Sequence, residues 1–253
     1  MRKRKRNIAG LLVVLIILFI TDSLILCLSG MPRLENAMEQ RYWEGMDLLD
    51  KYRENQDMVG WLQIEGTSIN YPVMRGEKYL HRNFKKERNA SGSLFVEEDW
   101  SSECICTLIY GHNMWMYGTM LNPLHKFKEQ DCFHRNRKIH FYVIQDSGQS
   151  AEKRTYNIIC CSKTSIDEWN YASCQYISSA EELRDFLDQC KRRAVQAMDI
   201  EYESEGAIVL STCSYHVKGG KGRLLVAGIM TGRTDQTKID VQQTRAEESQ
   251  KTD

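Results

Sequence analysis

The chain has 253 residues, enough for one or two domains with a sizeable hydrophobic core. Hydrophobic residues make up 42% and charged residues 27%, as in an ordinary globular protein, and the formal net charge is zero. No basic excess therefore points to nucleic acid as a partner. The charge is unevenly spread, because residues 2–6 are five consecutive cations. Without them, 29 basic residues remain against 34 acidic ones, a net charge of −5.

The basic N-terminus is followed by an apolar run. It extends over Ile8–Ile20, is interrupted by Thr21-Asp22-Ser23, and continues over Leu24–Leu28. About 21 residues can cross a bilayer, and a basic flank keeps the N-terminus in the cytoplasm. We therefore predict a cytoplasmic tail over 1–7 and a transmembrane signal-anchor over 8–29. The protein would be single-pass in the cell membrane, with the remainder extracellular. The alternative is a cleaved signal peptide, although the residues after the run form a poor cleavage site.

The rest of the chain changes from a helical to a strand pattern. Between residues 30 and 57, apolar residues recur at helical spacing, which predicts an N-terminal helical segment. From 58 to 232, short apolar or alternating segments are typical of a mostly antiparallel barrel or sandwich of about eight strands. These segments are VGWLQI, SINYPVM, GSLFVEE, TLIYG, KIHFYVI, YNIICCS, AIVLST and RLLVAGIM. Pro72 in the second segment predicts an edge strand or a bulge.

One helix interrupts the predicted strands, between YNIICCS and AIVLST. Ser179 and Glu182 have the spacing of a capping box at its start. The apolar residues that follow fall on one helical face: Leu183, Phe186, Leu187, Cys190 and Ala194. From residue 233 the sequence is polar, which predicts a disordered C-terminal tail over 233–253.

The chain has nine cysteines, eight of them after the predicted membrane span. An exported domain can form disulfides, but the spacing gives neither a disulfide framework nor a tight Cys/His metal pattern. We therefore predict that most of these cysteines are small buried hydrophobic residues, and that the protein uses no metal and no cofactor. The acidic cluster Glu97-Glu98-Asp99 is a calcium candidate on composition alone, and a solvated turn is the simpler interpretation.

Cys213 differs from the other cysteines because it ends an apolar strand segment. A thiol nucleophile needs an acid–base partner and a group that stabilises an oxyanion. His112 directly follows the TLIYG strand, at the kind of strand end where catalytic groups gather. Arg223 begins the strand after a loop of nine residues, so antiparallel pairing would place its guanidinium beside Cys213. Each residue also has an ordinary explanation, as an inert thiol, a loop histidine or a solvated arginine, and the pattern alone leaves both interpretations open.

Three motifs carry a resemblance to a known family: LSTC at Leu210–Cys213, YGHNM at Tyr110–Met114, and Arg223 ten residues after the cysteine. They resemble the sortases, the membrane-anchored cysteine transpeptidases of Gram-positive bacteria, and most closely class B. The stretches DMVGWLQIEGTSINYPVM, YLHRNF and SGSLFVEEDW are also similar, so the resemblance covers about residues 35–232. It implies a mainly β fold, a closed barrel of about eight strands with an N-terminal helical segment and an extra helix before the catalytic-cysteine strand.

The resemblance also implies roles for the three residues. Cys213 would attack the carbonyl of a threonine in a C-terminal sorting signal and form a thioacyl-enzyme. His112 would protonate the leaving amine and then help to deprotonate the incoming one. Arg223 would hold the substrate carbonyl and the oxyanion. Five further residues resemble substrate-binding positions of the family: Ser211, Thr212, Leu80, Thr164 and Tyr171.

The implied partners are surface proteins that carry a sorting signal, and class B relatives accept Asn-Pro and other X-Pro-x-Thr signals. The acceptor amine would come from a peptidoglycan cross-bridge, from its lipid-linked precursor, or from a pilin lysine. Two other functions remain as alternatives. A thiol hydrolase would use the same three residues with water as the acceptor. A non-catalytic surface binding module would need none of them, and the presence of all three argues against it.

Overall fold

The computed structural model describes residues 48–135, 137–199 and 204–236. By its internal contacts the chain divides into two compact units, Met1–Tyr42 and Trp43–Asp253, and the described residues belong to the second. The predicted tail (1–7), the predicted signal-anchor (8–29) and the predicted helical segment up to residue 47 lie outside the described residues. Within the described part, no helix combines the length and apolar character that a membrane span requires.

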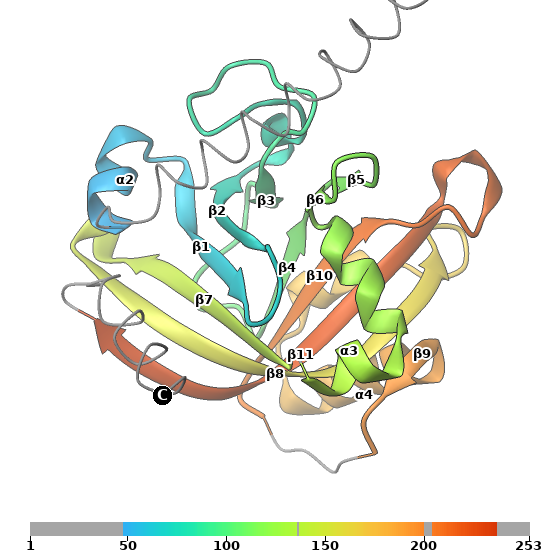
Figure 1. Ribbon diagram of the computed structural model, residues 1–253. Coiled ribbons are helices and arrows are strands. Elements are labelled where there is room, and N and C mark those ends of the chain that lie inside the picture. Colours follow the sequence, from blue (N-terminus) through green and yellow to red (C-terminus); the bar gives the residue numbers. More distant parts are fainter. Residues whose placement is uncertain (1–47, 136, 200–203, 237–253) are drawn as a thin grey trace, which may run out of the picture. The chain divides into compact units, whose positions relative to one another are not determined.

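Eight strands close into a β-barrel in the order β11-β10-β4-β3-β2-β1-β7-β8, and β8 pairs with β11 to complete it (Figure 1). The barrel strands are β1 (Met58–Ile64), β2 (Asn70–Arg75), β3 (Leu94–Val96), β4 (Cys106–Tyr110), β7 (Lys138–Gln145), β8 (Ser150–Ser165), β10 (Ala207–Cys213) and β11 (Gly222–Gln236). The short strand β9 (Ala194–Ala197) adds to β8, and β5 (Asn113–Met114) pairs with β6 (Thr119–Met120) in a separate hairpin. Closure leaves the eight barrel strands with neighbours on both sides, which protects their backbone groups.

Each of the eight predicted strand segments forms one barrel strand, so the mainly β class and the closed barrel are confirmed and the sandwich alternative is wrong. The edge-strand prediction for Pro72 is also wrong, because β2 lies between β1 and β3. Pairing with β3 begins only at Val73, so Pro72 lies where β2 has a single neighbour and its missing N–H is tolerated. The register shift in this pair lies in β1, between Met58 and Gly60.

The α-helices are α2 (Leu48–Glu54), α3 (Gln130–Arg135) and α4 (Ala180–Arg192). The 3₁₀ helices are η1 (Glu77–His81), η2 (Asn122–Lys128), η3 (Asp146–Gly148), η4 (Tyr171–Tyr176) and η5 (Lys218–Gly220). Both η4 and α4 lie in the connection between β8 and β10, as predicted for the extra helix. We refer to residues 171–192, which hold η4 and α4, as the insertion.

The start of α4 follows the predicted capping pattern with one shift. The Ser179 hydroxyl accepts from the Glu182 N–H at 3.2 Å, while the Glu182 carboxylate accepts from the Ser178 N–H at 2.8 Å. Two orphan N–H groups at the helix start are thereby satisfied. The predicted apolar face is buried from Leu183 to Cys190, but Ala194 begins β9 instead of extending the helix.

The predicted C-terminal tail begins too early. Strand β11 continues to Gln236, because residues 233–236 pair with residues 151–154 of the long strand β8. The polar composition of this stretch reflects an exposed strand end and not a disordered one. Residues 237–253 of the predicted tail lie outside the described residues.

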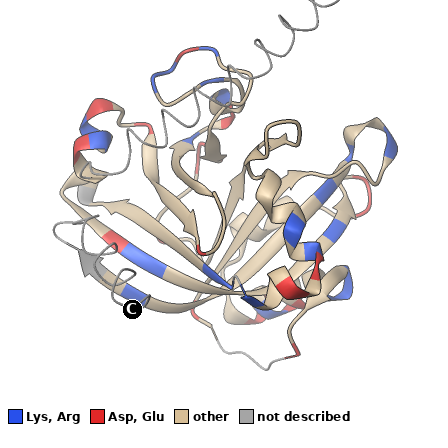
Figure 2. Ribbon diagram, in the orientation of Figure 1, with Lys and Arg blue, Asp and Glu red and all other residues tan. Residues whose placement is uncertain are grey.

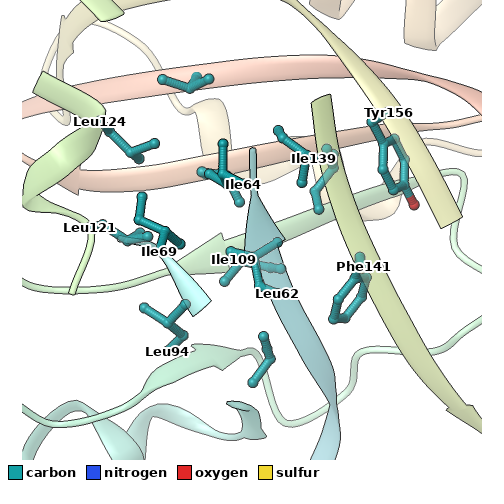
Figure 3. Packing of buried hydrophobic residues seen from close by; sticks show 14 of the residues in the cluster. Leu62, Ile64, Ile69, Leu94, Ile109, Leu121, Leu124, Ile139, Phe141 and Tyr156 are labelled. Atoms are coloured by element: carbon teal, nitrogen blue, oxygen red, sulfur yellow. The ribbon is translucent and has the colours of Figure 1, made fainter. Parts of the chain in front are cut away.

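Two apolar layers hold the fold together. Large aliphatic and aromatic side chains fill the barrel interior, including Leu62, Ile109 and Phe141 (Figure 3). A second cluster lies on the outer face of β4, β8, β10 and β11, where the insertion covers it. Strand β10 contributes alternately to both, with Ile208 and Leu210 in the interior and Val209 in the outer cluster. The interior is therefore packed, and reactive groups must lie on the outer face or at the barrel ends.

The bulged start of β1 gives a test of this packing. A Cβ atom at Gly60 would overlap the carbonyl oxygen of Tyr142 on β7, whereas one at Gly232 would meet nothing within 4 Å. We expect Gly60→Ala to lower stability by about 1–3 kcal/mol, a fall in Tm of several degrees, and Gly232→Ala to leave it unchanged or slightly raised. Thermal unfolding of the two variants measures this, and equal Tm values would contradict the close β1–β7 approach.

Candidate active site

Cys213, Arg223 and His112 come from three adjacent strands at one end of the barrel. The antiparallel register of β10 and β11 pairs Cys213 directly with Arg223, as the strand–loop–strand pattern predicts. Strand β4 runs parallel on the other side of β10, with Tyr110 opposite Ser211. The Gly111 N–H continues this pairing by donating to the Ser211 carbonyl at 3.1 Å. His112 follows directly, two residues after the end of β4, on the side of β10 opposite to Arg223.

Strand alternation decides the face on which the thiol lies. Val209 and Leu225 belong to the outer cluster, so Cys213 and Arg223, an even number of residues away, share the outer face. Cys213 is half-buried there. The thiol and the guanidinium therefore lie on the side of the barrel wall that the insertion covers, and not in the packed interior.

The His112 ring is half-buried and held by the backbone. Its Nε2 lies 2.8 Å from the Leu80 carbonyl oxygen, which can only accept, so Nε2 carries a proton. Nδ1 is then the nitrogen available to take up or release a proton. Burial lowers the pKa of His112, the Leu80 carbonyl opposes this shift, and the neighbouring His81 adds to it. At neutral pH the imidazole is therefore neutral, with Nδ1 unprotonated.

The Arg223 guanidinium is anchored through one nitrogen. Nη1 donates to the carbonyl oxygens of Gly220 in the β10–β11 loop at 2.8 Å and of Gly222 at the start of β11 at 2.9 Å. Within the described ranges, Nε and Nη2 have no protein acceptor. These N–H groups are free to donate to an oxygen beside Cys213, and Figure 2 shows the basic residues of this loop in blue.

Two donors fix the backbone of Cys213. Its carbonyl oxygen accepts from Asn113 Nδ2 at 3.0 Å and lies 3.1 Å from His125 Nε2. Asn122 Nδ2 in turn donates to Asn113 Oδ1 at 2.7 Å, which orients the Asn113 amide. Because a carbonyl only accepts, His125 Nε2 carries a proton here. Burial lowers the pKa of His125, and the Cys213 carbonyl opposes that shift.

Sequence reasoning missed His125 and gave Asn113 no role. Asn113 belongs to the YGHNM motif, so the motif itself was a signal for it. His125 lies in η2, 88 positions from Cys213, and does not follow a predicted strand. Only the folded position of η2 brings it to the Cys213 carbonyl.

The five predicted substrate-binding residues all lie close to this end of the barrel. The Ser211 hydroxyl donates to the Tyr171 hydroxyl at 3.0 Å, and the Thr212 hydroxyl donates to the Gly111 carbonyl at 2.8 Å. Thr164 pairs with Arg223 across β8 and β11. The Leu80 carbonyl holds His112. The side chains at 164, 171, 211 and 212 are all buried, and their contact with a substrate stays a prediction.

Exposed apolar side chains surround the site. Trp115 and Met116, both more than 60% exposed, lie in the β5–β6 hairpin just after His112. Tyr215 follows Cys213, and Ile166 follows the end of β8. We call these four residues the apolar rim. Among the described residues, no group of three His, Cys, Asp or Glu side chains could hold a metal ion.

Comparison with known proteins gives a consistent picture, although no protein-family model matches the chain. The chain is 30% identical over 188 residues to Sortase B of Listeria monocytogenes. The matched region covers 72% of this chain and 73% of the relative. The X-ray structure of Clostridium perfringens sortase B matches with a TM-score of 0.63 and 25% identity, over 72% of this chain and 98% of that one. A Streptococcus pyogenes class B sortase involved in pilus biogenesis matches with a TM-score of 0.60 and 29% identity, over 72% and 96%.

The protonation state of His112 can be measured directly. We expect long-range ¹H–¹⁵N NMR spectra to show the Nε2–H tautomer at neutral pH, because the Leu80 carbonyl requires a donor. On acidification, its imidazole should protonate below the usual histidine pKa of about 6.5. His112→Gln assigns the resonance. An Nδ1–H tautomer, or a midpoint at or above 6.5, would contradict the geometry.

Proposed function

The chain belongs to the class B sortases, and from that premise we propose that it cleaves a C-terminal sorting signal after threonine and transfers the surface protein to an amine. The sortase family supports a cysteine transpeptidase. The observation that carries the proposal is the Cys213–Arg223 register pair at the end of β10. The His112 imidazole, held by the Leu80 carbonyl, follows the adjacent parallel strand β4 by two residues. A thiol, a proton carrier and a free hydrogen-bond donor are the three parts that acyl transfer requires.

In the first half-reaction, the Cys213 sulfur attacks the threonine carbonyl of the sorting signal. His112 takes the thiol proton on Nδ1, which is unprotonated at neutral pH. The free N–H groups of Arg223 donate to the oxyanion of the tetrahedral intermediate. The imidazolium then gives its proton to the leaving amine, the C–N bond breaks, and a thioester on Cys213 remains.

In the second half-reaction, an acceptor amine attacks the thioester. His112 receives the proton that the amine loses, and the C–S bond breaks to release the new amide. Arg223 stabilises the same oxyanion a second time. The Leu80 carbonyl assists in both halves, because it accepts from Nε2 and so favours the charged imidazolium when it forms.

The surroundings of the site agree with a peptide substrate. The apolar rim offers Trp115, Met116, Tyr215 and Ile166 to apolar side chains of a sorting signal. Backbone positioning by Asn113 and His125 holds Cys213 while the substrate is exchanged. We propose that five residues near this end of the barrel shape the groove for the signal: Ser211, Thr212, Leu80, Thr164 and Tyr171.

The cellular location of the protein follows from the same proposal. We propose that residues 8–29 anchor the chain in the cell membrane, with residues 1–7 in the cytoplasm and the barrel outside. The partners are then surface proteins with sorting signals and a peptidoglycan amine, from the cross-bridge or its lipid-linked precursor. The Streptococcus pyogenes relative takes part in pilus biogenesis, so a pilin lysine is the other acceptor to test.

The full chain, incubated with quenched X-Pro-x-Thr peptides and an amine acceptor, tests the function. We expect cleavage after threonine, an adduct on Cys213, and a ligated product when the amine is present. Cys213→Ala should abolish turnover. His112→Ala and Arg223→Lys should each lose about 10²–10³-fold in kcat/KM, because the lysine point charge cannot replace the planar fork.

His216→Ala is the matched control for this series, since His216 bonds to Ser214 in the β10–β11 loop and not to the three site residues. It should keep near-normal activity. Turnover by Cys213→Ala would refute the assignment. Cleavage without ligation, for every amine offered, would favour the thiol hydrolase.

His125 is expected to act as a positioning residue, and two variants separate this from a bulk structural role. His125→Leu removes the second donor to the Cys213 carbonyl and should lower kcat about tenfold with little change in KM. His125→Gln retains an N–H donor and should recover most of the loss. His134→Ala, on the exposed face of α3, serves as the control. Equal activities of the Leu and Gln variants would contradict the positioning role.

A further inference from the structure

Four buried cysteines face one another across the boundary between the barrel wall and the insertion. Cys106 on β4 and Cys160 on β8 lie on the outer face of the barrel. Cys174 in η4 and Cys190 in α4 lie on the covering layer. All four have no exposed surface and belong to the same apolar cluster. Two thiols thus come from each side of one interface.

The first pair joins η4 to β4. The Cys174 side chain raises the pKa of the Cys106 thiol, so the two free thiols are neighbours within the cluster. Tyr171 lies one 3₁₀ turn before Cys174, so both side chains point to the same side of η4. The Tyr171 hydroxyl accepts from Ser211 on β10, the strand beside β4. Two neighbouring contacts therefore hold η4 against two adjacent strands, and one of them is a thiol pair.

The second pair joins the end of α4 to β8. The Cys160 and Cys190 side chains shift each other's pKa, so the two free thiols are neighbours within the cluster. The Ser162 hydroxyl, two residues along β8 and on the same face as Cys160, donates to the Cys190 carbonyl at 2.7 Å. The Cys190 backbone is thus fixed above the strand that carries its partner thiol.

We propose that Cys106–Cys174 and Cys160–Cys190 are two disulfide sites that fasten the insertion to the barrel. Each bond forms when two thiols transfer two electrons and two protons to a disulfide oxidant, such as oxidised glutathione or a dithiol oxidase, which leaves as two thiols. The proposal goes beyond transpeptidation and shares with it only the location outside the cytoplasm, where such bonds persist.

Three of the remaining cysteines lie away from these four thiols. Cys161 follows Cys160 directly, but strand alternation turns it into the barrel interior. The Cys104 thiol contacts the Thr107 hydroxyl at 3.4 Å, before β4 and at the end opposite the active site. Cys213 lies at the open strand end beside Arg223. Among the described residues, no group of three His, Cys, Asp or Glu side chains could hold a metal ion, so no metal centre competes for these four thiols.

The chemistry of the pairs indicates when the bonds form. The neighbouring Cys174 side chain and burial raise the pKa of the Cys106 thiol, and burial with the neighbouring Cys160 raises that of Cys190, whereas Cys190 lowers the pKa of Cys160. None of the four thiols has exposed surface, so an oxidant in solution reaches them slowly once the domain is folded. Oxidation therefore belongs to folding, before α4 and η4 close over the barrel wall. Once formed, the bonds would keep η4, and with it Tyr171, under the Ser211 hydroxyl near the nucleophile.

Disulfide mapping of the full chain tests this without any activity assay. The chain is refolded in a mixture of reduced and oxidised glutathione, alkylated in denaturant without further reduction, digested and analysed by mass spectrometry. We expect linked peptides that join 106 to 174 and 160 to 190. Of nine cysteines, five should then be alkylated, Cys213 among them. Reductant should lower the Tm by about 5 °C or more.

Variants make the assignment specific. Cys174→Ala should lose only the 106–174 link, and Cys190→Ala only the 160–190 link, while Cys132→Ser keeps both. Nine free thiols after refolding in the glutathione mixture would overturn the proposal, as would a stable protein with any other linkage. This mapping on the unmutated chain decides the matter even if a variant does not fold. The mapping is also independent of the proposed transpeptidase activity. A protein with both disulfides and no activity would refute the proposed function and leave the disulfide proposal standing.

Discussion

The pairing of β10 with β4 on one side and β11 on the other is the constraint on which the site depends. The antiparallel register pairs Cys213 with Arg223, and the parallel register brings the end of β4, which His112 follows by two residues, beside the end of β10. A shift of one residue in either pairing would turn Cys213 or its partner into the packed interior. The apolar side chains at 208 and 210 make such a shift costly, since it would expose them and bury polar neighbours. Core packing thus fixes the geometry of the chemistry.

Polar contacts then remove the remaining freedom of the strand end. The Ser211 and Thr212 hydroxyls each bond to a neighbouring element, and the Cys213 carbonyl has two donors. Each bond contributes about 1 kcal/mol to stability, but their combined effect is to hold the thiol at one position relative to Arg223. Precise placement is where such an enzyme gains rate. The buried hydroxyl pair before the cysteine therefore matters as much for the direction of the strand as for contact with a substrate.

Local sequence patterns were enough to predict much of this arrangement. All eight barrel strands, the α4 cap and the Cys213–Arg223 pairing follow from alternation, capping residues and loop length. The features that the sequence did not predict depend on residues that are distant along the chain. Strand β9 exists because β8 extends past β7 and offers it a free edge. The polar end of β11 is a strand only because β8 pairs with it. Likewise, His125 reaches the Cys213 carbonyl through the packing of η2, which no local period encodes.

A chain with nine cysteines and one proposed nucleophile must keep that nucleophile apart from the other thiols. The fold does so by direction and by burial. Cys161 faces the barrel interior, whereas its neighbour Cys160 lies beneath α4 with no exposed surface. Cys104 lies before β4, at the end of that strand opposite to Cys213. Among the described thiols, Cys213 is the one that pairs with Arg223, at the last outward position of β10. The same alternation that builds the barrel therefore selects which sulfur can react.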